Sequence, residues 1–138
     1  MNNPIRAILA AGPVIMLIAF FSAIANGAGP SQVTKSHICK AGIATVMGRD
    51  PSIMRIDNDL DGVLYLSYVR DDDSSFWGYK CKVEGSLIIW ASDTGRWRDH
   101  PADSRLSYRI EAETIHVEEG HSNGSTTKKS FTLDQLGD

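Results

Sequence analysis

The chain has 138 residues and a formal net charge of −3, and hydrophobic residues make up 42% of the sequence. This length and composition are typical of one globular domain that can bury a real but modest core. The slightly acidic balance argues against a general nucleic-acid-binding protein, which normally carries a basic excess.

The N-terminal segment has the features of an export signal. Arg6 supplies a positive charge, residues 8–21 are almost wholly apolar, and Ala23-Ile24-Ala25 offers the small-x-small pattern that a signal peptidase cuts. Such a signal predicts a periplasmic or secreted protein with no stable membrane insertion after cleavage. The alternative is an uncleaved anchor, although the apolar run is shorter than the about 20 residues that a membrane-spanning helix needs. The sequence thus divides into a signal peptide at 1–25, a flexible lead-in at 26–33 and a single exported domain at 34–138.

The domain is predicted to begin with one amphipathic helix. From Thr34 onwards apolar residues recur at a spacing of four, and Gly48 is expected to end the helix. Thr34 or Ser36 is expected to cap its start. Gly42 lies in the middle of the helix, where Gly costs about 1 kcal/mol relative to Ala. We therefore expect Gly42 to mark a close approach to another backbone.

The rest of the chain is predicted to form about six or seven short antiparallel strands, because β-prone runs alternate with turn residues. The expected strands are residues 53–56, 63–69, 76–83, 87–91, 106–110, 114–118 and 126–133, with a longer loop at 92–103. Trp77 and Trp90 fall within strands and are expected in the core. The predicted fold is therefore α+β and mainly β, with one N-terminal helix packed on a curved antiparallel sheet or a small barrel.

Cys39 and Cys81 are the two cysteines of the chain. In an exported protein such a pair predicts one disulfide. Cys39 lies on the apolar face of the predicted helix and Cys81 on the apolar face of strand 76–83, so this bond would join helix to sheet. The alternative is a reactive or metal-binding thiol pair, but the chain has no C-x-x-C motif to support it.

The histidines show no spacing that is typical of a metal site, and none is expected beside an obvious nucleophile. They are His37, His100, His116 and His121. We accordingly predict neither a metal nor a cofactor.

Two acidic motifs suggest more specific chemistry. Asp93-Thr94-Gly95 resembles the D-T-G of aspartic proteases, in which paired carboxylates activate a water. Its neighbours Ser92 and Arg96 depart from the residues of that family. Residues 57–62 match the opening of a calcium loop, but Tyr68 stands where that loop requires a Glu. At both places a turn built from Asp, Asn and Gly is the favoured interpretation.

The loop at residues 94–101 is the most unusual stretch, because Arg96, Trp97 and Arg98 stand together and His100 follows. Arg and Trp are enriched at binding hot spots. We predict that these four residues contact an envelope protein or a small anionic or saccharide ligand. In the alternative interpretation Trp97 covers one end of the sheet and the arginines pair with nearby aspartates, namely Asp93, Asp99 or Asp103.

The sequence therefore predicts a small exported, preferably periplasmic, non-catalytic binding or inhibitory protein. Its overall plan of export signal, antiparallel β domain and disulfide is similar to that of small periplasmic lysozyme inhibitors. Two alternatives stay open. One is a small homodimeric aspartic-type hydrolase that uses Asp93, and the other is an accessory subunit of an envelope assembly.

Overall fold

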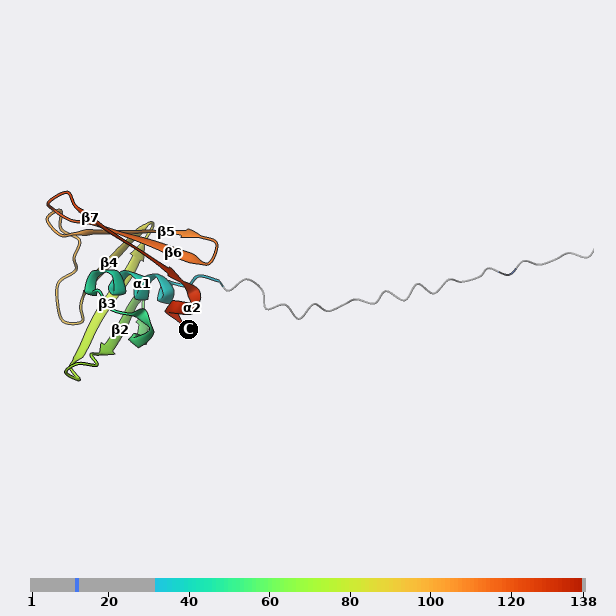
Figure 1. Cartoon of the computed structure of the whole chain (residues 1–138), viewed down its shortest axis with the longest axis horizontal. Helices are drawn as coiled ribbons and strands as arrows, with labels where there is room; N and C mark the ends of the chain where they lie inside the picture. The colour runs from blue at the N-terminus through green and yellow to red at the C-terminus, as the bar shows by residue number, and fades with distance from the viewer. Residues whose placement is uncertain (1–11, 13–31, 138) are drawn as a thin grey trace, which may run out of the picture.

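The computed structural model describes residue 12 and residues 32–137 (Figure 1). The predicted signal peptide and lead-in lie almost wholly outside the described residues. Within the described part of the chain, no helix has the length and apolar character needed to cross a membrane.

Seven antiparallel strands form one sheet, and their order in the sheet is their order in the sequence. The strands are β1 Arg55–Leu60, β2 Val63–Val69, β3 Phe76–Glu84, β4 Leu87–Ser92, β5 Arg105–Glu111, β6 Thr114–Gly120 and β7 Thr126–Thr132. The helical elements are α1 Lys35–Met47, the 3-10 turn η1 Pro51–Ile53 and α2 Leu133–Leu136. The predicted α+β fold, mainly β with one main helix, is confirmed. Among the described strands β1 does not pair with β7, so the sheet is open rather than a closed barrel.

The sheet bends sharply between β4 and β5. Only Leu87 and Ser107 pair across this junction, whereas the other neighbouring strands are matched along most of their length. Figure 1 accordingly shows β5 and β6 running across the direction of β2 and β3, and α1 contacts strands on both sides of the bend. The helix therefore fills the concave side of the sheet, which we call the inner face.

The helix begins and ends as its sequence predicts. The Thr34 hydroxyl accepts a hydrogen bond from the His37 backbone N–H, and Gly48 ends the helix in the left-handed conformation with φ of 60°. Cys39 of α1 forms the predicted disulfide with Cys81 of β3, with the two Cα atoms 5.9 Å apart. Both cysteines are completely buried in the core.

Gly42 does mark a close approach, but its neighbours are side chains rather than a backbone. A Cβ atom added at Gly42 would lie 2.9 Å from Cγ2 of Ile88 and 3.2 Å from Cδ2 of Leu106. Ile88 belongs to β4 and Leu106 to β5, so the helix sits closest to the sheet where the two strands diverge.

Two sequence predictions need correction. β1 continues through residues 58–60, and the turn itself is only Asp61 and Gly62, whose φ angles of 52° and 81° suit a tight type I′ hairpin. Trp77 is 41% exposed and not in the core. Its ring N–H donates to the Ser75 hydroxyl over 2.7 Å at the end of the β2–β3 hairpin, which holds the side chain away from the centre of the sheet. Trp90 is partly buried and packs against the core.

The short helix α2 was not predicted, because Leu133 was included in the last strand. Thr132 ends β7 and caps α2, since its hydroxyl accepts from the Gln135 backbone N–H. Lys40 of α1 is buried, and its Nζ donates to the Leu136 carbonyl over 3.0 Å. The end of the described chain is therefore fastened to α1.

Candidate functional site

Loop 93–104 connects β4 to β5 and runs beside β4, where the Arg98 backbone N–H donates to the Trp90 carbonyl over 2.8 Å. Its Trp97 side chain lies on the outer face of the sheet, opposite α1. Lys80 and Lys82 point to this face because they alternate along β3 with the cysteine that is bonded to α1. Their partners in β4 are Ala91 and Ile89, which share the same face. Both partners are buried although they face away from the helix, which is consistent with cover from the loop.

Trp97 lies beside two cations that come from another part of the chain. The Nζ atoms of Lys80 and Lys82 are each 4.7 Å from the centre of the Trp97 ring. Cation–π contacts of this kind contribute about 0.5–1 kcal/mol at exposed sites. The sequence singled out the basic-aromatic loop, but not its contact with Lys80 and Lys82. We call the combined set the Trp97 surface, and its members are Lys80, Lys82, Arg96, Trp97, Arg98 and His100. Within this set, Arg98 extends to the other side of β4 from Trp97, because its guanidinium lies beside Trp90, which pairs with Cys81.

Asp103 fastens the loop. Its two carboxylate oxygens accept hydrogen bonds from the Arg96 guanidinium over 2.7 and 2.8 Å, and Oδ2 also accepts from the His100 backbone N–H over 3.1 Å. Arg98 adds a longer ion pair of 3.8 Å. The Arg96 guanidinium holds the pKa of the Asp103 carboxyl well below its usual range. The alternative interpretation of the sequence, in which the arginines of this loop pair with nearby aspartates, therefore holds for Arg96 and Asp103.

Replacing Asp103 by Asn is expected to loosen loop 93–104 and to reduce the acid sensitivity of the fold. The native pKa of Asp103 lies below its unfolded value of about 3.9. Its ionised form therefore stabilises the fold above about pH 4, and this stabilisation is lost as the pH falls towards the native pKa. Thermal unfolding followed from pH 2 to 7 by circular dichroism should show a smaller acid-induced drop for D103N than for the wild type. Asp99→Asn, in the same loop, is the matched control, and an equal effect there would contradict the prediction.

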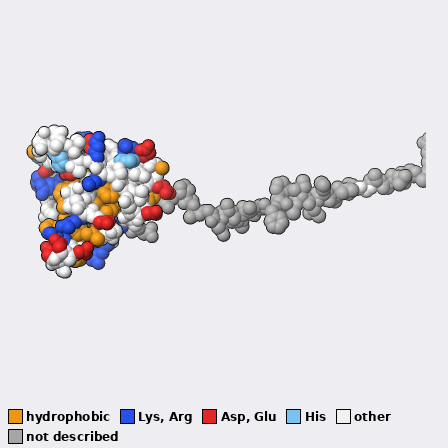
Figure 2. Space-filling model, in the orientation of Figure 1, with side chains coloured by type: hydrophobic (Ala, Val, Ile, Leu, Met, Phe, Trp, Pro, Cys, Tyr) orange, Lys and Arg blue, Asp and Glu red, His pale blue; other side chains and the backbone are white. Residues whose placement is uncertain are grey.

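A cleft of about 560 Å³ opens where β4 and β5 diverge. Its volume lies in the range that is typical of small-molecule sites. The lining combines apolar strand residues with polar loop residues, among them Leu87, Ile89, Leu106, Arg98, His100 and Arg105. His100 also lines a shallower hollow over Trp97, so this one side chain borders both depressions. Figure 2 shows basic side chains next to hydrophobic ones on the face of the domain that it presents.

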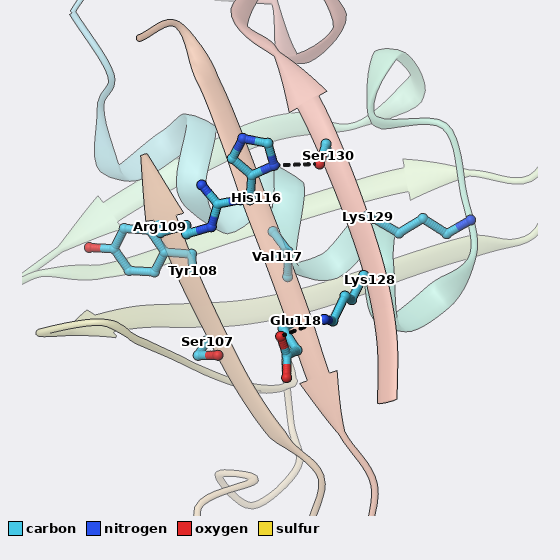
Figure 3. A pocket seen from close by; sticks show the side chains of 9 residues that line it. All are labelled: Ser107, Tyr108, Arg109, His116, Val117, Glu118, Lys128, Lys129 and Ser130. Atoms are coloured by element: carbon cyan, nitrogen blue, oxygen red, sulfur yellow. Dashed lines mark hydrogen bonds and ion pairs between the residues drawn. The ribbon is translucent and has the colours of Figure 1, made fainter. Parts of the chain in front are cut away.

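A second polar cluster lies on the outer face of β5–β7 (Figure 3). His116 of β6 stands directly opposite Ser130 of β7, and its Nδ1 is 2.7 Å from the Ser130 Oγ. The other ring nitrogen, Nε2, lies 3.3 Å from Oε2 of Glu111. His116 and Ser130 border a groove of about 240 Å³. Strand pairing thus places His116 beside a serine hydroxyl, a neighbour that the sequence did not indicate because the two residues lie far apart in it.

The two acidic motifs form turns or strand ends. Asp93 is exposed in the turn after β4, and its backbone N–H donates to the Gly78 carbonyl over 3.1 Å. Asp57 lies within β1 and pairs with Arg55 over 2.8 Å. Among the described residues, no group of three or more His, Cys, Asp or Glu side chains is arranged to hold a metal ion.

Comparison with known proteins identifies no relative of this chain. No protein-family model, no curated protein and no solved structure matches the chain, so the site is argued from its own residues.

Proposed function

We propose that this protein is a small binding or inhibitory protein that contacts its partner through the Trp97 surface and the adjoining β4–β5 cleft. One observation carries the proposal: Asp103 holds Arg96 and the His100 backbone, so the loop is fastened within the chain itself. A loop that is ordered in advance loses less conformational entropy on binding. Trp and Arg, which the loop presents, are the residue types that most often dominate binding energy.

A location outside the cytoplasm is part of the proposal. The Cys39–Cys81 disulfide supports it, because such bonds persist in oxidising compartments and are rare in the cytosol. The export-signal pattern at residues 1–25 supports the same location.

The charges of the Trp97 surface favour an anionic partner. Lys82 pairs with Glu84 over 3.2 Å, whereas Lys80 has no carboxylate within ion-pair distance among residues 32–137. The Arg98 guanidinium lies 5.7 Å from the Trp90 ring and makes only a long ion pair. Lys80 and Arg98 thus retain donors for a carboxylate of an envelope protein or of an acidic saccharide.

Capture from an envelope extract tests this function. The bait is compared with a triple variant that carries Lys80→Ala, Trp97→Ala and Arg98→Ala, which leaves the Arg96–Asp103 ion pair intact. We expect partner recovery to fall at least about 10-fold, because removal of a hot-spot side chain typically costs about 2 kcal/mol or more and each 1.4 kcal/mol is tenfold in affinity. Lys128→Ala with Lys129→Ala, on distant β7, is the control. Identical partner lists for the wild type and the triple variant would overturn the proposal.

An accessory subunit of an envelope assembly remains a second candidate, and one observation favours it. Val69 and Phe76 pair across β2 and β3 on the outer face, where their side chains are 50% and 60% exposed. Exposed apolar side chains that adjoin one another are typical of protein contact sites. Loss of a captured protein on Phe76→Ser, with no loss in the Trp97-surface triple variant, would favour this function over the first.

A further inference from the structure

Beyond the binding function, we propose that Ser130 is a nucleophilic residue that accepts acyl groups from small activated esters. In this assignment His116 acts as the general base and Glu111 orients His116. The proposal concerns the groove on the outer face of β5–β7 and does not depend on the Trp97 surface.

Strand pairing brings His116 next to Ser130 on one side and Arg109 on the other. Arg109, His116 and Ser130 stand opposite one another on β5, β6 and β7. Figure 3 shows the His116 ring between the Arg109 and Ser130 side chains, with its hydrogen bond to the serine drawn. The Ser130 Oγ is 2.7 Å from Nδ1 of His116, and a nucleophile and its base must lie within such hydrogen-bond reach.

Glu111 determines which histidine nitrogen is available to the serine. Its Oε2 lies 3.3 Å from Nε2 of His116, which favours the tautomer with the proton on Nε2 and the lone pair on Nδ1. The Nη1 atom of Arg109 donates to the same Glu111 oxygen over 2.7 Å. Arg109, and then His116, lower the pKa of Glu111, so this carboxylate is ionised near neutral pH.

The proposed reaction consumes only the ester and one water molecule. The Ser130 Oγ attacks the carbonyl carbon of an ester while its proton passes to Nδ1 of His116. The carbon–oxygen bond to the leaving group then breaks, and the leaving oxygen takes the proton from Nδ1 as an alcohol or phenol. Water attacks the acyl-Ser130 ester by the same route, so the acid is released and the Ser130 hydroxyl is restored.

The groove sets limits on substrate and rate. Its volume of about 240 Å³ restricts the acyl group to a small one. Arg109 in its lining, which also donates to Glu111, supplies positive charge for the developing oxyanion, whereas Lys128 is paired with Glu118 over 3.7 Å. Glu111 is 69% exposed, so water screens its charge. We therefore expect the loss of His116 to slow the reaction far more than the loss of Glu111.

Labelling of the whole protein with a fluorophosphonate probe tests the proposal, because fluoride leaves when a nucleophilic serine attacks phosphorus. Mass spectrometry of the intact chain and of its peptides is expected to show one adduct, located on Ser130 and absent from Ser130→Ala. Labelling of His116→Gln should be at least about 100-fold slower. Glu111→Gln should be slowed about 10-fold or less.

His121→Gln is the matched control. His121 follows β6 and also lies within hydrogen-bond distance of a β7 hydroxyl, that of Thr127 at 3.0 Å, yet it has no part in the proposed step. This variant should label at the wild-type rate, as should the Trp97-surface triple variant. Circular dichroism spectra that match the wild type show that each variant is folded. No adduct, an adduct on another residue, or equal labelling rates for His116→Gln and the wild type would overturn the proposal.

Discussion

Loss of the Cys39–Cys81 disulfide is expected to lower the free energy of unfolding by about 4 kcal/mol. The bond joins residues 42 positions apart, and a loop of this size removes much conformational freedom from the unfolded chain. It is also the covalent link between α1 and the sheet on which the helix packs. Since a domain of this size has a total stability of roughly 5–15 kcal/mol, the disulfide is expected to contribute a large share.

Reversible urea unfolding measures this effect in the oxidised protein, the reduced protein, Cys39→Ser, Cys81→Ser and the double variant. The two single variants should lose similar amounts of stability, and the double variant should lose little more, because all of them remove one shared bond. Equal unfolding midpoints for the oxidised and reduced wild type would contradict the prediction.

Gly42→Leu is expected to destabilise the fold by about 3 kcal/mol, because it adds a side chain where the core has no room. The first added carbon alone would meet Ile88 and Leu106 at 2.9 and 3.2 Å. Gly42→Ala should cost much less than Gly42→Leu. Its single added carbon displaces the neighbouring side chains by a smaller volume, and Ala gains about 1 kcal/mol over Gly within a helix.

Chemical unfolding of a small double-mutant cycle checks the cause. Ile88→Ala removes the atoms nearest to the added carbon, so it should relieve part of the cost of Gly42→Leu. The double variant should therefore be more stable than the sum of the two single effects predicts. Strict additivity would show that the crowding at Ile88 is not the cause.

Local chemistry made much of this fold predictable from the sequence. Thr34 and Gly48 cap the helix through groups within a few residues. The sequence therefore predicted the end at Gly48 and gave Thr34 as one of two candidates for the start. The bounds of β2 were also predicted correctly, from its run of β-prone residues. Helix periodicity and strand alternation placed Cys39 and Cys81 on facing surfaces, and the chain offers no other cysteine.

The sequence predictions failed at a few positions where two local preferences conflict. Residues 58–60 carry Asp and Asn, which favour turns, yet they pair with β2 and extend β1 up to the tight turn at Asp61. Leu133 follows a β-prone segment, but the capping hydroxyl of Thr132 ends the strand and starts α2. Trp77 is apolar in character but lies at the end of a hairpin, where the sheet offers less cover.

By itself, the sequence determined a helix joined by a disulfide to an antiparallel sheet, and it singled out the loop around Trp97. Only the tertiary structure decided that the sheet stays open, that Lys80 and Lys82 lie beside Trp97, and that His116 meets Ser130. The physical reason is that these contacts depend on strand register and on the bend between β4 and β5. Both are set by packing between residues far apart in the chain, which no local pattern encodes.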